Sequence, residues 1–444
     1  MYLTPEAAAS FLEVHPEIKR VDVYIIDLNG FFRGKRISAR QLISAASSGV
    51  RLPLSIFASD ITGNTVEETG LGLDTGDMDY ACRPLADSLA ISPWDPTLAL
   101  AQLDMLNPQG ESAFADPMTQ LEIMLERFQK KGLQVDAGIE LEFYLLDQDR
   151  SFPRGAISGR QQLTSQVYGL KELDDSAPFF DAAEVALQSL GIEAEAVSSE
   201  AAPGQYEITL HHHRDISRLC RDVSLVKRTL RNLAPAHGLL TTFMAKPFAD
   251  LSGNGLHLHV SLVDEKGAGI FKDDDGPNPL LANAIGGVLD TLAEAMLANA
   301  PHGNSYRRFL PNAYAPVTAS WGRDNRSVAI RIPNDGDARF EHRVASTDTN
   351  PYMVAAAVLA GALHGLDTKA ELPPAATGNT YRQQQHDYLP AGWDTAIDVW
   401  SAAEILPKYF DPQFMHLYSV LKRAEYNTYL AQIPPVDFDW YFEA

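Results

Sequence analysis

The sequence predicts an α+β fold in which a small β-rich domain, residues 1–110, precedes a large α+β domain over residues 111–444. The length of 444 residues is about two to three times that of a typical domain, which favours two domains or one large barrel-like domain. Hydrophobic residues make up 45% and charged residues 21%, ordinary values that exclude disordered, coiled-coil and collagen-like classes. Strand-like segments dominate before residue 110, and strand-like and helix-like segments alternate after it.

The N-terminal region carries hairpin and loop signals. Residues 21–37 form two apolar runs on either side of Asn29-Gly30, a pattern that predicts a β-hairpin. The Pro- and Asp-rich segments GLDTGDMDYACRPL and SPWDPT follow, and they predict loops that cross a small β domain.

Capping residues mark three helices in the larger domain. The first begins at Asp116-Pro117, where an N-cap residue precedes proline, and it ends at Gly132. The second begins at Asp215 and keeps apolar residues at helical spacing. The third follows Asn350-Pro351 and is so rich in alanine that it must pack closely against another element.

Charge and cysteine content exclude several partners. The formal net charge is −22 and no dense basic run occurs, so a nucleic-acid partner is not expected. Cys82 and Cys220 lie far apart, which excludes a disulfide scaffold or a thiolate zinc site and suits a reducing cytoplasm. The N-terminus shows no signal-peptide pattern, and the most apolar stretch, residues 352–363, is shorter than the ~20 residues of a membrane span. We therefore expect a soluble, cytoplasmic protein with no membrane partner.

Two glutamates interrupt an apolar strand pattern in GIELEFYLL. Glu140 and Glu142 share one face because side chains alternate along a strand. Two buried like charges need a counter-charge, either a divalent cation or an arginine. An exposed strand with two solvated glutamates explains this segment equally well.

A second strand pattern, NGLHLHVSL, places His257, His259 and Ser261 on one face and aliphatic residues on the other. A lone strand histidine is usually packed and hydrogen-bonded. Two at this spacing favour a wall that faces a ligand, because imidazole suits divalent metals. The preceding SGNG turn lets backbone N–H groups approach an anion.

Arginines concentrate in the third segment. Arg339, Glu341 and Arg343 alternate with apolar residues in ARFEHRV, and further arginines lie just upstream in SYRRFLP and NRSVAIRIP. Guanidinium groups suit a bidentate grip on carboxylates or phosphates. Structural ion pairs are the alternative.

The remaining polar motifs carry weaker signals. Glu200 in a loop and Glu207 in a strand flank a Pro-Gly turn. Glu193 and Glu195 are expected on a surface strand, and residues 211–213, three histidines, on a polar edge. No Walker-type, HExxH or dinucleotide GxGxxG motif occurs, so metals and arginines would have to hold the phosphates of any bound nucleotide.

Taken together, these segments resemble the glutamine synthetase family. The resemblance rests on GIELEF, APGQYE, KPFADLSGNGLHLHVS, SYRRFLPNAYAPV, NRSVAIRIP and FEHRV…NPY, and it covers most of the chain from about Asp60 to Tyr352. It implies a β-grasp-like N-terminal domain and a catalytic domain shaped as an incomplete β-barrel with surrounding helices. It also implies homo-oligomers of stacked rings, dodecamers by analogy, with active sites between subunits.

The resemblance also implies a role for each candidate residue. Two or more divalent cations, Mg²⁺ or Mn²⁺, would be held by one set formed by Glu142, Glu200 and Glu207 and by another formed by Glu140, His257 and Glu341. The positions that match contacts to ATP are His259, Ser261, Arg326 and Arg339. The positions that match contacts to the transferred phosphate are Arg326 and Arg331. The positions that match contacts to glutamate are Gly253, Arg308 and Arg343. Asp60 matches an aspartate that reaches across the subunit boundary and takes a proton from the attacking amine.

These roles imply an ATP-dependent ligase. ATP phosphorylates the γ-carboxylate of glutamate, and an amine then attacks the γ-glutamyl phosphate. Only the unprotonated amine attacks, and an alkyl amine that titrates near ~10.4 is about one part in 10³ unprotonated at pH 7. A carboxylate such as Asp60 would attract the ammonium and accept its proton.

Two departures from the family pattern bear on the amine. Ammonia-using members carry a glutamate just before Ala-Pro-Val, where this chain has Tyr314. A phenol presents an aromatic wall that suits alkyl chains and attracts cations, and Trp321 would extend that wall unless it is ordinary packing. Ser252 replaces an amide-bearing residue that contacts glutamate. Both departures resemble the γ-glutamylpolyamine synthetase branch, which favours putrescine or a longer polyamine as substrate.

Two alternatives remain at this stage. The first is a glutamine synthetase that uses ammonia, which Tyr314 argues against. The second is a non-catalytic structural or regulatory relative. That alternative predicts erosion of the ligand positions, yet all six metal-ligand positions are present.

Overall fold

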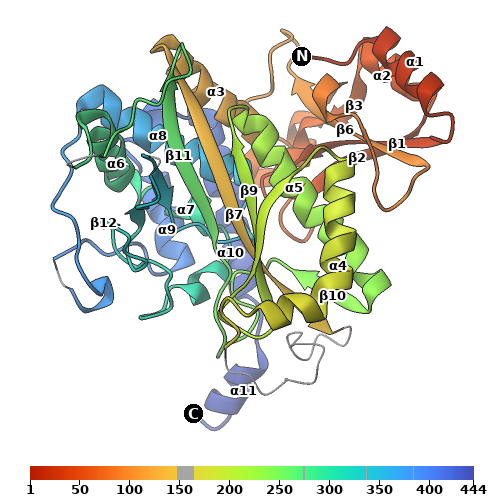
Figure 1. Cartoon of the computed structure of the whole chain (residues 1–444). Coiled ribbons are helices and arrows are strands. Elements are labelled where there is room, and N and C mark those ends of the chain that lie inside the picture. The colour runs from red at the N-terminus through yellow and green to blue at the C-terminus, as the bar shows by residue number, and fades with distance from the viewer. Residues whose placement is uncertain (148–164, 274–275, 337, 384) are drawn as a thin grey trace.

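Two β-sheets organise the chain, one built before residue 110 and one after it (Figure 1). The computed structural model describes residues 1–147, 165–273, 276–336, 338–383 and 385–444. The strands of the first sheet are β1 (Arg20–Ile26), β2 (Phe32–Ser38), β3 (Val50–Pro53), β4 (Asp79–Pro84), β5 (Ala90–Ile91) and β6 (Leu98–Leu106). They are ordered β2-β1-β6-β4-β3, and β5 pairs with β6.

The predicted hairpin is confirmed. β1 and β2 pair antiparallel, and Gly30 in the turn between them has a φ of 77°, which favours glycine. Two helices that were not predicted, α1 (Pro5–Val14) and α2 (Gln41–Ser48), accompany this sheet. The side chain of Thr4 accepts a hydrogen bond from the backbone of Ala7, so α1 begins with the same cap-and-proline signal as the helix at Asp116.

One loop prediction was wrong in part. Within GLDTGDMDYACRPL, the residues from Asp79 onward form β4, which pairs antiparallel with both β3 and β6. Pairing on both sides outweighs the local turn signals of Asp and Pro, and Pro84 lies at the strand end, where a missing N–H is tolerated. The segment SPWDPT does form the loop between β5 and β6.

The second sheet has eight strands. They are β7 (Leu133–Asp147), β8 (Ala194–Ser199), β9 (Gln205–His213), β10 (Leu239–Thr242), β11 (Leu256–Asp264), β12 (Trp321–Arg323), β13 (Ile330–Ile332) and β14 (Phe340–His342). Their order is β12-β13-β14-β11-β7-β9-β8, with β10 added to β7. In the described residues the end strands β12 and β8 do not pair, so the sheet stays open. The long strands β7, β9 and β11 form its centre (Figure 1).

Helices surround this sheet, as an α+β fold requires. They are α3 (Pro117–Lys130), α4 (Leu170–Ser189), α5 (Ile216–Leu233), α6 (Pro279–Thr291), α7 (Met296–Asn299), α8 (Pro351–Thr368), α9 (Trp393–Ser401), α10 (Pro412–Leu430) and α11 (Pro435–Tyr441). The three predicted helices are confirmed as α3, α5 and α8. In each, the predicted cap residue, Asp116, Asp215 or Asn350, accepts a hydrogen bond from a first-turn amide.

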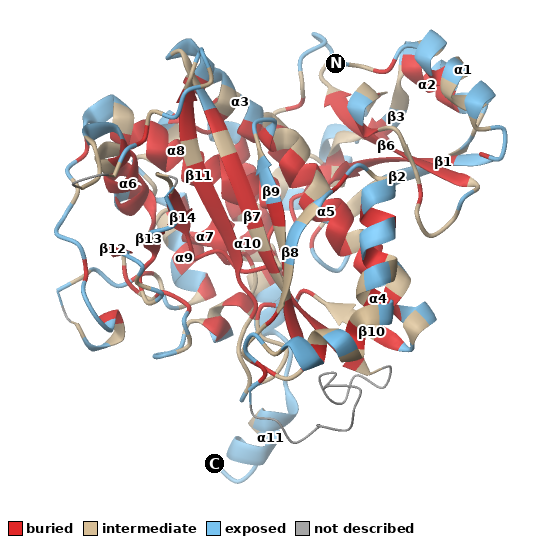
Figure 2. Ribbon diagram, in the orientation of Figure 1, coloured by how far each residue is buried: buried red, intermediate tan, exposed pale blue. Residues whose placement is uncertain are grey.

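The alanine-rich helix α8 lies at the centre of the core. It packs against α3, α5 and α6, and its residues from Pro351 to Gly365 are all buried (Figure 2). A methyl group at Gly365 would lie 1.9 Å from the carbonyl oxygen of Asn283, so the two helix backbones are in close contact. The predicted close packing is therefore confirmed.

The boundary at residue 110 stays a prediction, and it falls between β6 and α3. Both Cys82 and Cys220 are buried free thiols. Within the described part of the chain, no helix combines the length and the hydropathy that a membrane crossing needs.

Candidate active site

Cross-strand register brings the predicted polar residues together. Glu140 on β7 lies opposite His257 on β11, and Glu142 on β7 lies opposite Glu207 on β9. Side chains at directly opposite positions lie within contact distance on the same face of a sheet. The period-two pattern in three separate segments therefore forms one polar surface.

The same surface continues through the next two strands. His259 on β11 lies opposite Glu341 on β14, and Glu341 in turn lies opposite Arg331 on β13. Glu341 is fully buried, and its carboxylate forms ion pairs with Arg331 and Arg343. Burial raises its pKa, but the positive charge of Arg343 and its neighbours outweighs burial, so Glu341 is ionised.

A hydrogen-bonded chain runs across this face. One carboxylate oxygen of Glu140 accepts a hydrogen bond from Nδ1 of His257 at 2.8 Å, and the other accepts one from Nε2 of His259 at 3.1 Å. Nε of Arg339 donates to Nδ1 of His259 at 3.2 Å, which leaves Nε2 as the protonated nitrogen of that ring. Burial opposes ionisation of Glu140, yet the hydrogen bonds from both histidines outweigh it and lower the pKa of Glu140.

Within the described part of the chain, no hydrogen bond reaches Nε2 of His257. Burial lowers its pKa, so the ring is neutral at neutral pH. Because Nδ1 faces Glu140, the proton lies there and Nε2 carries a lone pair. That is the form in which imidazole binds a metal.

Glu142, Glu200 and Glu207 form a compact carboxylate group. One oxygen from each lies within 4.8 Å of the others. Burial and the charge of Glu200 raise the pKa of Glu142 to about 8, and burial with the surrounding carboxylates raises the pKa of Glu207 well above its usual range. Arg308 and Arg343 offset only part of this repulsion at Glu142, so the donor set and the electrostatics of the group fit a divalent cation.

The second predicted ligand set is arranged differently. Glu140 belongs to two groups of possible ligands, one with His259 and Glu341 and one with Glu207 and His257. The predicted trio of Glu140, His257 and Glu341 is thus divided between them. His257 and Glu341 are nevertheless close, with Nδ1 and a carboxylate oxygen 3.6 Å apart.

Three of the residues predicted to contact ATP line one cavity of about 1090 Å³. These are His259, Ser261 and Arg339, and Glu140 lines the same cavity. The hydroxyl of Ser261 donates to the carbonyl of Ala338 at 3.3 Å, which ties β11 to the segment that carries Arg339. This cavity is large enough for a nucleotide.

The predicted glutamate-binding arginines lie side by side. Nη1 and Nη2 of Arg308 donate to the backbone carbonyls of Val344 and Arg343, at 2.8 and 3.3 Å. A methyl group at Gly253 would lie 2.8 Å from Cγ of Arg308, and one at Gly255 would lie 2.7 Å from its Nη2 and 3.0 Å from Nε2 of His257. The two glycines therefore leave room for a buried arginine next to the carboxylate group.

Arg326 and Tyr314 line a separate cavity of about 710 Å³. Tyr314 is 66% exposed and has a φ of 56°, so its side chain stands out from an unusual loop conformation. Tyr381 lines the same cavity, and its hydroxyl donates to the carbonyl of Ala315 at 2.9 Å. That hydrogen bond holds the loop next to Tyr314.

Trp321 is not brought together with Tyr314. It is 6% exposed, packs in the main hydrophobic core, and donates its indole N–H to the carbonyl of Pro373 at 2.6 Å. Its burial in the core fits the alternative of ordinary packing, and a place in the aromatic wall stays a prediction. Trp321 is the first residue of β12, a strand at the end of the sheet, and its indole ring packs in the core because removing so large an apolar group from water is strongly favourable.

Asp60 lies in a tight loop of the N-terminal region. Its Oδ1 accepts hydrogen bonds from the backbone and hydroxyl of Thr62 at 2.8 and 2.7 Å, and from the backbone of Asn64 at 2.9 Å. No contact joins it to the polar surface of the second sheet within the described residues of one chain. A place in an active site would therefore require a second subunit.

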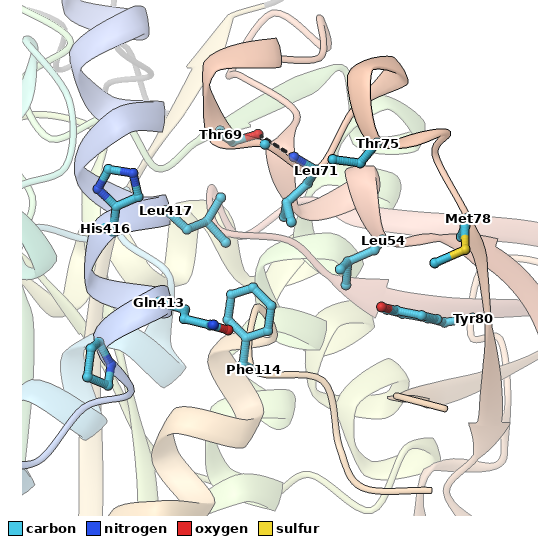
Figure 3. A pocket seen from close by; sticks show the side chains of 12 residues that line it. Leu54, Thr69, Leu71, Thr75, Met78, Tyr80, Phe114, Gln413, His416 and Leu417 are labelled. Carbon is cyan, nitrogen blue, oxygen red and sulfur yellow. Dashed lines mark hydrogen bonds between the residues drawn. The ribbon is translucent and has the colours of Figure 1, made fainter. Parts of the chain in front are cut away.

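A further cavity of about 590 Å³ lies away from all of these residues (Figure 3). Leu417 and His416 on α10 face Leu54, Leu71 and Phe114 across it. None of the predicted site residues lines it. It therefore marks contact between α10 and the N-terminal region rather than the polar site.

A family model described as the glutamine synthetase catalytic domain matches residues 114–441. The chain belongs to the glutamine synthetase family. This membership confirms the predicted enzyme class, a glutamate–amine ligase.

Individual relatives support the same assignment. The chain is 36% identical to the γ-glutamylputrescine synthetase PuuA of Escherichia coli (strain K12), over 97% of this chain and 93% of that one. It is 30% identical to a glutamate–isopropylamine ligase of a Pseudomonas species, over 93% and 92%. A solved structure described as a GmaS/ADP complex superposes with a TM-score of 0.88 and 25% identity, over 98% of this chain and 99% of that one, which confirms the predicted fold type.

Some site features have no clear sequence signal. Tyr381 lies in a polar loop outside the resembling motifs, and only the fold brings it to Tyr314. Glu193 and Glu195 are exposed as expected, but Glu195 and His212 line the nucleotide-sized cavity. Plain side-chain alternation would place both on the face opposite Glu207, because His212 is five positions from Glu207 and Glu195 is three positions from Ser198, the residue that pairs with Glu207. Register shifts between Ala137 and Ile139 and between Ala194 and Ala196 change these faces, and no local sequence pattern predicts them.

Proposed function

We propose that this ligase joins the γ-carboxylate of L-glutamate to an alkyl amine of the polyamine class, such as putrescine. Tyr314 is the observation that carries the proposal. It occupies the place of the ammonium-binding glutamate, and it stands exposed in a cavity that also holds Tyr381 and Arg326. A phenol ring offers an apolar wall for methylene groups and a π-face for a distant ammonium.

The names of the two relatives described above agree with a larger amine. Putrescine and isopropylamine both carry alkyl carbon next to the reacting nitrogen. Their identities of 36% and 30% cover nearly the whole chain, including the loop with Tyr314. The similarity supports the substrate class, and Tyr314 supplies the physical reason.

In this proposal the carboxylate surface holds Mg²⁺ or Mn²⁺. Glu142, Glu200 and Glu207, whose oxygens lie together, hold one cation. Glu140, His257 and Glu341 hold another, and Nδ1 of His257 lies 2.8 Å from Glu140 and 3.6 Å from Glu341. Bound cations neutralise phosphate charge and activate the phosphoryl group for transfer. The protein's own part is to keep Glu140 ionised through two histidines and to keep His257 neutral.

ATP occupies the cavity of about 1090 Å³ in the proposal, with its phosphates against His259, Ser261 and Arg339. Arg331 and Arg326 stabilise the transferring phosphoryl group by charge-assisted hydrogen bonds. Arg331 is already fixed by Glu341, whereas Arg326 is exposed on a loop. We therefore assign Arg331 a preset position and Arg326 a contact that forms when substrates bind.

Glutamate binds through Arg308, Arg343 and the backbone at Gly253 in the proposal. Both guanidinium groups are buried, so a substrate carboxylate there would interact in a medium of low polarity. Asp60 of a neighbouring subunit accepts the proton of the ammonium. Ring assembly from several copies and a cytoplasmic location complete the proposal; the two free thiols support a reducing compartment.

ADP formation with glutamate and different amines tests the substrate. Wild-type enzyme is assayed with putrescine, a longer polyamine, isopropylamine and ammonium at equal concentrations, with Mg²⁺ or Mn²⁺. We expect kcat/KM to be highest for a polyamine. Equal or better kcat/KM with ammonium would replace the proposal with a glutamine synthetase that uses ammonia.

A further inference from the structure

A fully buried ion pair ties the C-terminal part of the chain to its N-terminal region. Nζ of Lys422 lies 2.9 Å from a carboxylate oxygen of Glu425, one turn further along α10. Lys422 is 0% exposed and Glu425 is 3% exposed. Burying two charges costs more than their attraction returns unless further hydrogen bonds satisfy them, so the other partners of this pair define its role.

Those partners belong to two loops of the first domain. The second oxygen of Glu425 accepts the backbone N–H of Ile61 at 2.8 Å and the side-chain amide of Asn29 at 2.7 Å. Nζ of Lys422 donates to the amide oxygen of Asn29. The carboxylate of Glu425 therefore holds the residue directly after Asp60.

Helix α10 is well placed to act as an anchor. Its N-terminal half faces Leu54 and Leu71 of the N-terminal region across the cavity of Figure 3. Its C-terminal half presents Lys422 and Glu425 to the hairpin turn and to the loop after Asp60. The loop is thus fixed from the outside by a helix more than 350 residues away in sequence.

The loop itself fixes one oxygen of Asp60 and leaves the other available. Oδ1 accepts three hydrogen bonds from Thr62 and Asn64. Among the described residues, no hydrogen bond reaches Oδ2. Because these hydrogen bonds tie the largely buried side chain to its own loop, a small movement of the loop backbone would change which atoms Oδ2 can reach.

We propose that Glu425 is a positioning residue for Asp60. By holding the N–H of Ile61, it sets the direction of Oδ2, which takes one proton from the substrate ammonium and leaves a neutral amine to attack the acyl phosphate. Lys422 and Asn29 hold Glu425 in place, because both donate hydrogen bonds to its carboxylate. This inference rests on the proposed function, because it needs Asp60 to act as the base.

Two nucleophiles separate positioning from a merely structural role. An alkyl amine or ammonium must lose a proton before it attacks, whereas hydroxylamine is already unprotonated at neutral pH. Each variant is assayed with both nucleophiles at saturating ATP and glutamate. In Glu425→Ala we expect the amine rate to fall about ten- to a hundredfold while the hydroxylamine rate changes less than about threefold.

Three further variants sharpen the test. Glu425→Gln keeps an acceptor for Ile61 and should restore most of the amine rate. Lys422→Met with Glu425→Leu removes both charges, which protects folding, and should show the same selective loss as Glu425→Ala. Glu294→Ala is the matched control, because Glu294 also holds backbone amides, those of Glu404, Ile405 and Leu406, and we expect no change in the ratio of the two rates.

The outcomes are distinct. Equal loss with both nucleophiles in the Glu425 variants would overturn the inference and leave a structural ion pair. An additional loss when Asp60→Asn is combined with Glu425→Ala would also overturn it, because residues that act through one group are not additive. No activity of the wild type with any amine would instead overturn the proposed function.

Discussion

The polar surface on the second sheet and the loops around Tyr314 and Asp60 are built in opposite ways. On the surface, Glu140 and His257 lie on paired strands and hydrogen-bond to each other at 2.8 Å. In the loops, Tyr314 is 66% exposed and Asp60 has its contacts in its own turn and through Ile61. Strands fix geometry, whereas loops vary at little cost to stability. In the proposed function, phosphate activation therefore belongs to the rigid part, and the choice of amine to the variable part.

The largest effect on activity is expected for Glu142→Ala, on the polar surface of the second sheet. Removal of one member of the carboxylate group should lower ADP formation at least about a thousandfold with every amine, since the group supports phosphoryl transfer itself. The matched control is Glu193→Ala, an exposed carboxylate just before β8 of the same sheet, which should keep wild-type activity. Retention of more than a tenth of the activity in Glu142→Ala would contradict the assignment.

Cation binding should stabilise the protein through the carboxylates of the polar surface and not through the loop that carries Tyr314. In a thermal melt, excess Mg²⁺ or Mn²⁺ should raise the Tm of the chelator-treated protein. At a cation concentration a hundredfold above Kd, the free energy of unfolding should increase by about 2.7 kcal/mol. Glu207→Ala should abolish this shift, and Tyr314→Ala should retain it. A cation-induced shift that survives in Glu207→Ala would place the cation elsewhere.

Tyr314→Glu should shift the amine preference from putrescine toward ammonium and leave the polar surface of the second sheet unchanged. A carboxylate in place of the phenol would attract ammonium, and we expect kcat/KM for ammonium to rise about tenfold while that for putrescine falls. Tyr314→Phe keeps the ring and serves as the control, with putrescine kcat/KM within about threefold of wild type. The idea of an aromatic amine pocket fails if ammonium use does not increase.

The smallest effect on activity is expected at Trp321. Because it packs in the core and donates to Pro373, Trp321→Phe should lower the free energy of unfolding by about 1–2 kcal/mol. The KM for the amine should stay within about twofold of wild type. A large increase in that KM with unchanged stability would return Trp321 to the amine pocket.

The sequence alone determined the strands and their polar faces. Glu140 and Glu142, or His257 and His259, share a face whatever the strand pairs with, since alternation is a local property of the backbone. Cap residues such as Asp116 and Asn350 act within one turn, so the starts of α3 and α8 were equally local.

Tertiary structure decided which segments meet. β4 became a strand only because β3 and β6 pair with it on both sides, and Trp321 entered the core although its neighbours suggested a pocket. The hydrogen bond from Ile61 to Glu425 joins residues 364 positions apart, and nothing near either residue encodes it. Contacts of this kind depend on the relative placement of whole elements, which is set by the summed packing of the core and not by any local pattern.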